Sequence, residues 1–192
     1  MKSLMWFRND LRMDDNPALR EACRSSDEVH AIYIYSQNQN KKHNEANCKT
    51  EFFIENLKVL EDELSNINIP LNIITSEGFK DNSEVISNYV KNHSLNKVFW
   101  NNQFGIDESE RDLSVQNYLK GKNIEFENFD EQVVFAPGTI LTGEGKPYSV
   151  FTPFKRRWIE NFNLDLLDIE FEYTKKNATK IKSEFCFPNN SS

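Results

Sequence analysis

Short apolar segments alternate with helical segments over the first 130 residues, and this alternation constrains the fold more than any other feature of the sequence. The expected strands cover residues 4–7, 29–35, 70–75, 97–100 and 124–129. The expected helices cover residues 17–23, 50–64, 82–93 and 107–119. Strands separated by helices of this length pair in parallel through crossover connections. The sequence therefore predicts an α/β fold, a Rossmann-like five-stranded parallel sheet with helices on both faces.

Residue choice at the expected helices supports this prediction. Asn16 stands where a helix N-cap is needed, and Pro17 occupies the first helical position, which both residue types favour. Phe53, Leu57 and Leu60 recur at the spacing of one helical face.

The alternation ends after Phe129, and this change divides the chain. Residues 1–130 form the predicted α/β domain. Residues 131–162 are rich in Gly and Pro before a helix expected from about Pro153, so we assign them to the same domain as an irregular segment and closing helix. Residues 163–192 are polar with weak periodicity, and they are predicted to be an interdomain linker or tail.

Composition excludes several classes of protein. The chain has 192 residues and a net charge of −7, which argues against broad charge-driven binding of nucleic acid. No run approaches the ~18 apolar residues of a membrane span, and the start lacks the apolar stretch of a secretory signal. The three cysteines and three histidines are scattered, without the spacing of a metal site. We therefore expect a cytoplasmic protein that needs no disulfide or metal.

Phosphate-binding loops are also excluded. Gly138 and Gly143 have the spacing of a Walker loop, but Glu144 stands where lysine is required. No G-x-G-x-x-G fingerprint follows the first strand.

Charged side chains follow two of the expected strands. Arg8 and Asp10 come directly after the first strand, at the edge where open α/β sheets bind ligands. Salt bridging and helix capping are the simpler explanation for this loop. Asp107 and Glu108 open the helix after the fourth strand, where acidic side chains complement the helix dipole. A carboxylate facing the crevice could also accept two N–H bonds from the amidine-like edge of a heterocycle.

A third charged group lies near residue 155. Lys155 and the two arginines after it stand between aromatic residues. A solvated amphipathic helix explains this pattern, and a contact to DNA phosphate is the functional alternative.

Two long motifs carry a family resemblance. Residues 6–19 read WFRNDLRMDDNPAL, and residues 145–158 read GKPYSVFTPFKRRW. Both resemble signatures of the DNA photolyase/cryptochrome family, in the expected order and about 140 residues apart. The resemblance covers roughly residues 1–162 and is nearest to bacterial cyclobutane pyrimidine dimer photolyases.

The resemblance implies a binding site for a light-harvesting antenna chromophore. His43 and Glu108 match family positions that contact methenyltetrahydrofolate, and Asp107 replaces an asparagine of that site. Arg8 and Asp10 match a deeper site that other branches use for a deazaflavin or flavin. We favour folate, and Lys155 matches a lysine that contacts DNA phosphate.

The resemblance also implies a longer parent protein. A helical C-terminal domain would hold FAD, the electron-transfer tryptophans and most of the surface that binds damaged DNA. This chain alone is then expected to bind folate weakly, to have no catalytic residue and to repair no DNA. An exposed interdomain face could allow self-association. Two alternatives stay open: a stand-alone α/β nucleotide or small-molecule binding module, and a cryptochrome-type photoreceptor domain.

Overall fold

The computed structural model describes residues 1–36, 38, 46–164, 171–177 and 182–185. In chain order the elements are β1 (Lys2–Phe7), α1 (Pro17–Ser25), β2 (Glu28–Ser36), α3 (Asn47–Ser65), β3 (Leu71–Ser76), the short 3₁₀ helix η1 (Phe79–Asp81), α4 (Asn82–Asn92), β4 (Lys97–Asn101), α5 (Ile106–Gly121), β5 (Glu125–Phe129), α6 (Phe151–Asn161) and β6 (Glu184–Phe185).

The strands form one sheet in the order β5-β4-β1-β2-β3-β6, and every pairing is parallel. The five predicted strands are confirmed. The sheet gains a sixth, two-residue strand, β6, from the segment predicted to be a linker or tail. The strand order reverses between β1 and β4, so a crevice is expected beyond the carboxyl ends of these two strands.

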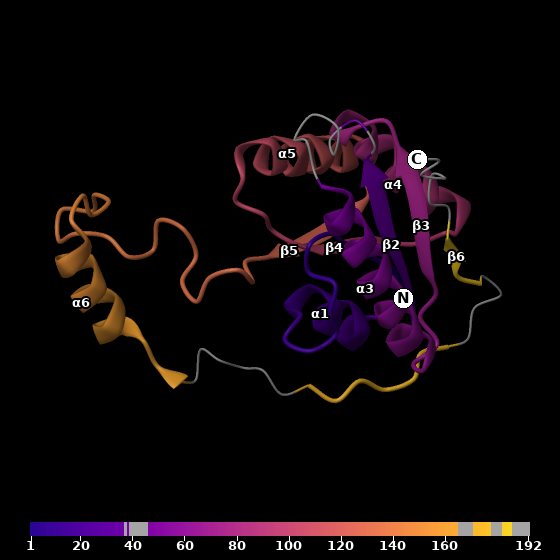
Figure 1. Ribbon diagram of the computed structural model, residues 1–192, viewed down its shortest axis with the longest axis horizontal. Coiled ribbons are helices and arrows are strands. Elements are labelled where there is room, and N and C mark those ends of the chain that lie inside the picture. Colours follow the sequence, from indigo (N-terminus) through magenta and orange to yellow (C-terminus); the bar gives the residue numbers. More distant parts are fainter. Residues whose placement is uncertain (37, 39–45, 165–170, 178–181, 186–192) are drawn as a thin grey trace.

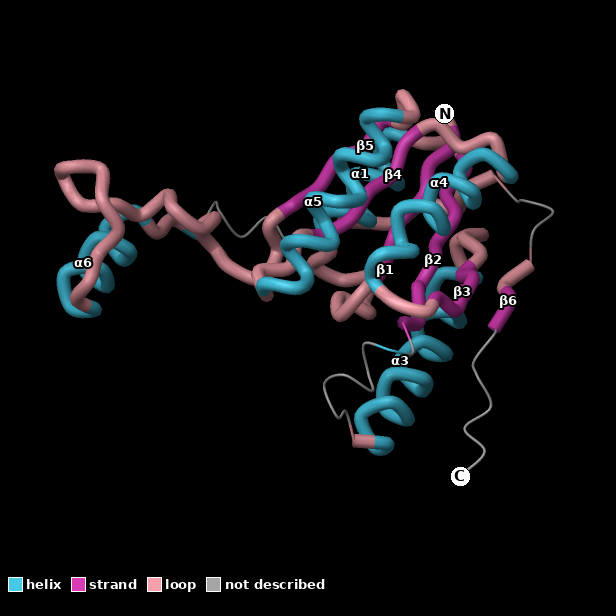
Figure 2. The backbone as a smooth tube through the Cα atoms, turned by 90° about the horizontal axis from the view of Figure 1, so that it is seen from above, coloured by secondary structure: helices cyan, strands magenta, loops and turns pink. Residues whose placement is uncertain are grey.

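Helices cover both faces of the sheet, as the sequence predicted (Figure 2). Alternate residues of β1 point to opposite faces, as the pleat of a strand requires. Met5 and Phe7 lie in the core that α1 and α3 cover, whereas Leu4 and Trp6 lie in the core that α4 and α5 cover. All four side chains are at most 1% exposed, which explains why the second part of this strand, residues 4–7, is an unbroken apolar run.

Helix α1 begins as its sequence predicts. The backbone N–H of Leu19 donates to Asn16 Oδ1 over 3.0 Å, and Pro17 is the first helical residue. This cap sits beside the loop after β1, so it helps to position the residues at the edge of the sheet.

Residues 130–150 form no helix or strand, and α6 follows them (Figure 1). Helix α6 projects from the sheet and buries none of its residues. Its Trp158 packs on Phe135 and Phe162, with ring centroids 5.4 and 5.2 Å apart. The predicted helix is therefore present, and its assignment to the same domain as the sheet stays a prediction.

The described residues after α6 return to the sheet. Residues 171–177 run beneath α1 and α3, and β6 then pairs with β3 (Figure 1). Phe171 and Tyr173 pack against the core beside α1. The predicted role of residues 163–192 as an interdomain linker stays a prediction, but these parts of the segment belong to the packing of the α/β unit.

Within the described ranges, we find no helix with the length and apolar character needed to cross a membrane.

Candidate functional site

Two neighbouring cavities lie at the carboxyl edge of the sheet. The smaller, of about 160 Å³, is enclosed by the ends of β1 and β2, the start of α3 and the start of α5. The larger, of about 480 Å³, lies between the turn after β3 and the first half of α5. Phe79 and Arg111 line both cavities. Only the larger one reaches the ~300 Å³ that ligand pockets commonly exceed.

The two cavities differ in charge. Arg8, Lys49 and Arg111 line the smaller cavity and face one carboxylate, Glu108. Four carboxylates line the larger cavity with two cationic side chains, and these six residues are Glu77, Asp81, Asp107, Glu110, Lys80 and Arg111. The smaller cavity therefore favours ligand groups that accept hydrogen bonds, and the larger cavity favours ligand groups that donate them.

Arg8 is a buried cation with spare donors. Its side chain is 5% exposed, and Nη1 donates to Asp112 Oδ1 over 3.2 Å. Its Nε and Nη2 atoms have no partner among the described residues. Burial lowers the pKa of Arg8 to about 10, an effect that nearby Arg111 adds to and Asp112 partly offsets. A buried guanidinium with unpaired N–H groups is suited to bind a ligand carbonyl or an anion.

Arg111 is held from several sides. Its Nε and Nη2 donate to Asp112 Oδ1 over 2.9 and 2.7 Å, and Nη2 also donates to Gln103 Oε1 over 2.8 Å. The guanidinium carbon lies 5.0 Å from the ring centre of Trp6 and 4.7 Å from that of Phe79. These contacts fix the position of Arg111, which lines both cavities.

The Asp10 carboxylate is held by hydrogen bonds within the fold. Its Oδ1 accepts from the backbone N–H of Arg8 over 2.8 Å, and its Oδ2 accepts from Asn101 Nδ2 over 2.6 Å. Asn101 Nδ2 also donates to Asn16 Oδ1. Asp10 thus joins β1, β4 and the cap of α1, and it lines neither of the two cavities.

Asp107 and Glu108 begin α5 next to each other but serve different cavities. Asp107 lines the larger cavity, and Glu108 lines the smaller one. Both are half-buried. The Glu108 carboxylate lies against Gly105, where an added Cβ atom would clash with Oε2. The absence of a side chain at Gly105 therefore makes room for this carboxylate.

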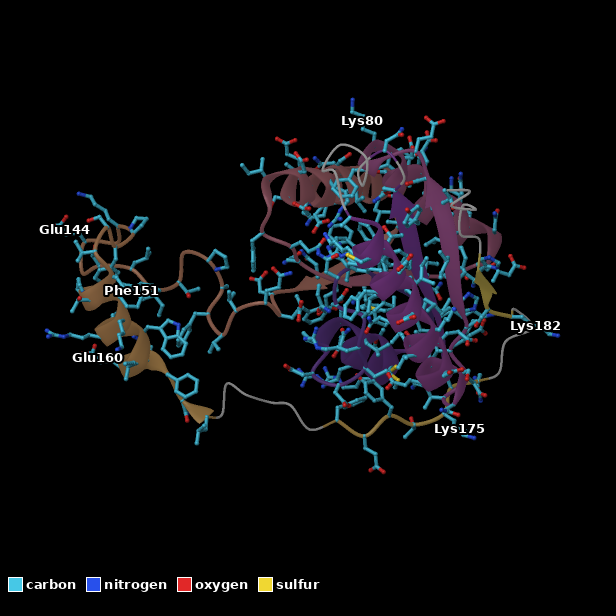
Figure 3. The ribbon with its side chains drawn as sticks, in the orientation of Figure 1. Lys80, Glu144, Phe151, Glu160, Lys175 and Lys182 are labelled. Atoms are coloured by element: carbon cyan, nitrogen blue, oxygen red, sulfur yellow. The ribbon has the colours of Figure 1, made fainter. Side chains whose placement is uncertain are left out.

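The remaining predicted residues are not part of this constellation. His43 lies outside the described residues. Lys155 is exposed on α6, which stands apart from the sheet. Figure 3 shows this separation, with Lys80 of the larger cavity on the main body and Phe151 and Glu160 of α6 on the projection.

Sequence reasoning missed three residues that line the cavities, which are Phe79, Gln103 and Arg111. It also missed Asp112, which accepts hydrogen bonds from Arg8 and Arg111. Arg111 stands three residues after Glu108, and this spacing could have placed both on one face of α5. Phe79 follows β3 in a turn, and nothing in the sequence distinguishes it from an ordinary partly buried aromatic residue.

Comparisons with known proteins identify the family that the chain resembles. The family model described as DNA photolyase matches residues 3–174. The deoxyribodipyrimidine photo-lyase of Salmonella typhimurium is 36% identical over 164 residues, which are 85% of this chain and 34% of that protein. The chain thus spans about a third of the length of the curated relatives it matches.

Solved structures share the fold. A class III photolyase from Agrobacterium tumefaciens superposes with a TM-score of 0.74 at 22% identity, over 96% of this chain and 37% of that one. A photolyase from Sulfolobus tokodaii, solved with two FAD molecules and discussed for a novel light-harvesting cofactor, gives a TM-score of 0.68 at 20% identity, over 93% of this chain and 38% of that one.

Proposed function

The chain belongs to the DNA photolyase family, and on that premise we propose that its crevice binds the antenna chromophore of a light-driven DNA repair enzyme. Its α/β fold is that of a photolyase N-terminal domain. The observation that carries the proposal is Arg8, a buried arginine with spare donors at a cavity beyond the strand ends. A core arginine with a purely structural role would normally have these donors satisfied.

The residues of the crevice fit a pterin. Arg8 would offer N–H groups to a ring carbonyl, and Glu108 and Asp107 would offer carboxylates to an amidine-like edge. Because Arg8 and Glu108 line the smaller cavity and Asp107 lines the larger one, such a ligand would extend over both cavities. A flavin or deazaflavin has carbonyl acceptors but lacks that amidine edge. We therefore favour methenyltetrahydrofolate over a flavin or deazaflavin, with His43 as a further contact.

The protein contributes binding and orientation to this function. Bound folate would supply the chemistry, namely absorption of near-ultraviolet or blue light and transfer of the excitation. Arg8 and Glu108 would fix the direction of the ring in its plane, because one is a donor and the other an acceptor. Trp6 and Phe79 hold the Arg111 guanidinium between them, so the folate ring would pack against a side chain that is fixed in place.

Titration with methenyltetrahydrofolate tests the proposal. Glu108→Gln keeps the shape of the side chain but replaces one acceptor oxygen and removes the charge, so we expect affinity to fall about 10-fold or more. The binding constant is measured from chromophore absorbance and fluorescence. Glu84→Gln, an exposed acid on α4, is the matched control and should bind like the wild type. Equal affinity of the Glu108 variant and the control would contradict a role for this carboxylate.

The rest of the photolyase activity is also part of our proposal. A helical domain holding FAD would receive the excitation and split the dimer, in a cytoplasmic enzyme that binds damaged DNA. The cryptochrome alternative is less supported, because bacterial relatives of 33–37% identity are photo-lyases. Self-association through the exposed apolar side chains of α6 would compete with docking of the helical domain.

Lys155 would contact DNA in that complete protein. In a protein that joins this chain to a photolyase helical domain, Lys155→Ala should flatten the slope of log K against log salt by about 0.9. DNA binding measured across a salt series gives this slope. An unchanged slope would show that Lys155 meets no phosphate.

A further inference from the structure

We infer that protonation of His30 releases strand β6 from the edge of the sheet, so that residues 182–185 dock on the α/β unit in a pH-dependent way. The residues that carry this inference lie near the amino ends of β2 and β3 and line neither of the two cavities. The inference is therefore independent of the proposed function.

A line of hydrogen bonds joins β6 to His30. The Glu184 backbone N–H donates to Asn72 Oδ1 over 3.1 Å, and Asn72 Nδ2 donates to the Tyr89 hydroxyl oxygen over 2.7 Å. The Tyr89 hydroxyl oxygen lies 3.4 Å from His30 Nδ1, and His30 Nε2 lies 2.9 Å from Glu28 Oε1. Asn72, Tyr89 and His30 are all less than a tenth exposed, so the line runs through the interior.

All donors in this line point the same way when His30 is neutral. Because the Glu28 carboxylate can only accept, His30 Nε2 carries the proton and Nδ1 is an acceptor. The Tyr89 hydroxyl then donates to Nδ1, while its oxygen accepts from Asn72. The neutral ring thus fixes the Asn72 amide in the orientation that presents Oδ1 to the Glu184 N–H.

A proton on His30 Nδ1 reverses the link to Tyr89. Burial raises the pKa of Tyr89 to about 12 and the nearby Glu184 carboxylate acts in the same direction, so the hydroxyl keeps its hydrogen. Both ring nitrogens of His30 then donate, and the Tyr89 hydroxyl loses its acceptor. The next acceptor along the line is Asn72 Oδ1, which the amide presents to Tyr89 only by turning over. Nδ2 then faces the Glu184 N–H, donor against donor, and β6 loses the side-chain acceptor that holds it.

His30 is surrounded by groups that set the direction of the pH response. Its side chain is fully buried, and burial lowers the pKa of the imidazole. His93 at the end of α4 and Lys2 on β1 lower this pKa further, whereas the Glu28 carboxylate on the same strand raises it. Because the folded state disfavours the proton, the contact is complete above the usual histidine pKa of about 6.5 and is lost as the pH falls below that value.

Strand β6 is suited to release because its pairing is short. It pairs with β3 over two residues, and Ser183 Oγ accepts from the Leu71 N–H over 3.2 Å. It lies at the outer edge of the sheet with β3 on one side (Figure 2). Loss of the Asn72 acceptor therefore removes a large share of these contacts, while the five longer strands stay paired.

Amide hydrogen exchange of the isotope-labelled chain, followed by nuclear magnetic resonance, tests the inference. Between about pH 7.5 and about pH 5.5, the protection of the Glu184 amide, corrected for the intrinsic exchange rate, should fall about 10-fold as the His30 ring signals titrate. The Leu4 amide, on a buried residue of β1, should stay strongly protected at both pH values, which separates release of β6 from unfolding of the whole chain.

Two variants break the line at different points. His30→Asn keeps an acceptor near the position of Nδ1 but takes up no proton, so Glu184 protection should no longer depend on pH. Tyr89→Phe removes the middle link, so Glu184 protection should again be independent of pH while His30 still titrates. His93→Asn is the matched control, because this half-buried ring lies 5.5 Å from that of His30 but is no part of the line. The control should keep the wild-type pH dependence.

Three results would overturn the inference. The first is unchanged Glu184 protection in the wild type while His30 titrates. The second is a His30 ring that takes up no proton above the pH at which the whole chain unfolds. The third is the full wild-type pH dependence in His30→Asn or, if that variant does not fold, in Tyr89→Phe. None of these results would bear on folate binding in the crevice.

Discussion

At the scale of single residues, the loop after β1 holds two buried charges with different surroundings, the carboxylate of Asp10 and the guanidinium of Arg8. Asp10 accepts hydrogen bonds from Asn101 and from the backbone of Arg8, and is 5% exposed. Arg8 has the same exposure but keeps unpaired donors beside a cavity. Two neighbouring charges that both matched the family's deeper site thus have different surroundings, and only Arg8 borders the space a ligand would fill.

Removing the Asp10 carboxylate tests whether it stabilises the loop after β1. Asp10→Ala should lower the free energy of unfolding by about 2 to 4 kcal/mol, because it leaves buried N–H groups of Arg8 and Asn101 without acceptors. Urea denaturation followed by circular dichroism measures this loss. Asp14→Ala in the same loop is the control, since Asp14 is exposed. A loss no larger than in the control would mean that the carboxylate does not hold this loop together.

Residues whose role is local could be predicted from the sequence, whereas residues whose role depends on distant partners could not. Asn16 caps the helix that starts beside it, and the structure confirms this. Burial lowers the pKa of Arg8, and two residues more than 100 positions away modify that effect: Arg111 adds to it and Asp112 partly offsets it. No sequence pattern indicates that Arg8, Arg111 and Asp112 lie together, so the geometry of the crevice could be seen only in the structure.

At the scale of secondary-structure elements, the segment after α6 stabilises an end of α1. The Lys176 ammonium donates to the backbone oxygens of Cys23 and Ser26, and the Lys176 N–H donates to Ile67 O. Carbonyls at a helix C-terminus lack partners within the helix, and a cation there also complements the helix dipole. Residues 171–177 therefore do more than connect other parts of the chain.

A lysine pair in this segment gives a direct test. Lys176→Met keeps the length of the side chain but removes its donors, so the free energy of unfolding should fall by about 1 to 2 kcal/mol. Lys175→Met changes the same charge on the neighbouring exposed residue, labelled in Figure 3, and should have almost no effect. Thermal and urea unfolding compare the two. Equal stability of both variants would show that the Lys176 ammonium contributes nothing to the stability of the fold.

The way in which β6 is held explains why the sequence predicted only five strands. The five predicted strands carry apolar residues, with runs of three or more in β1, β2 and β4, and this signal is strong. Strand β6 has two residues in a polar segment, and it is positioned by the edge of β3 and by Asn72 Oδ1, which accepts from the Glu184 N–H. Its pairing depends on an edge that exists only once the sheet has formed.

At the scale of the whole molecule, the described chain has two parts with different surfaces. The sheet and its four helices form a body with the crevice at one edge, and α6 stands away from it (Figure 1). Val150, Phe151 and Ile159 are more than half exposed on or beside α6. Apolar side chains in such positions are typical of an interaction surface, which agrees with our proposal that a helical domain docks there.

The central claim is that the chromophore binds at the carboxyl edge of the sheet. Nuclear magnetic resonance of the isotope-labelled chain, titrated with methenyltetrahydrofolate, tests it most directly. We predict that the side-chain N–H signals of Arg8, Gln103 and Arg111 shift on binding, and that the Trp158 indole signal on α6 does not. Shifts confined to α6, or no shift at saturating folate, would contradict the account.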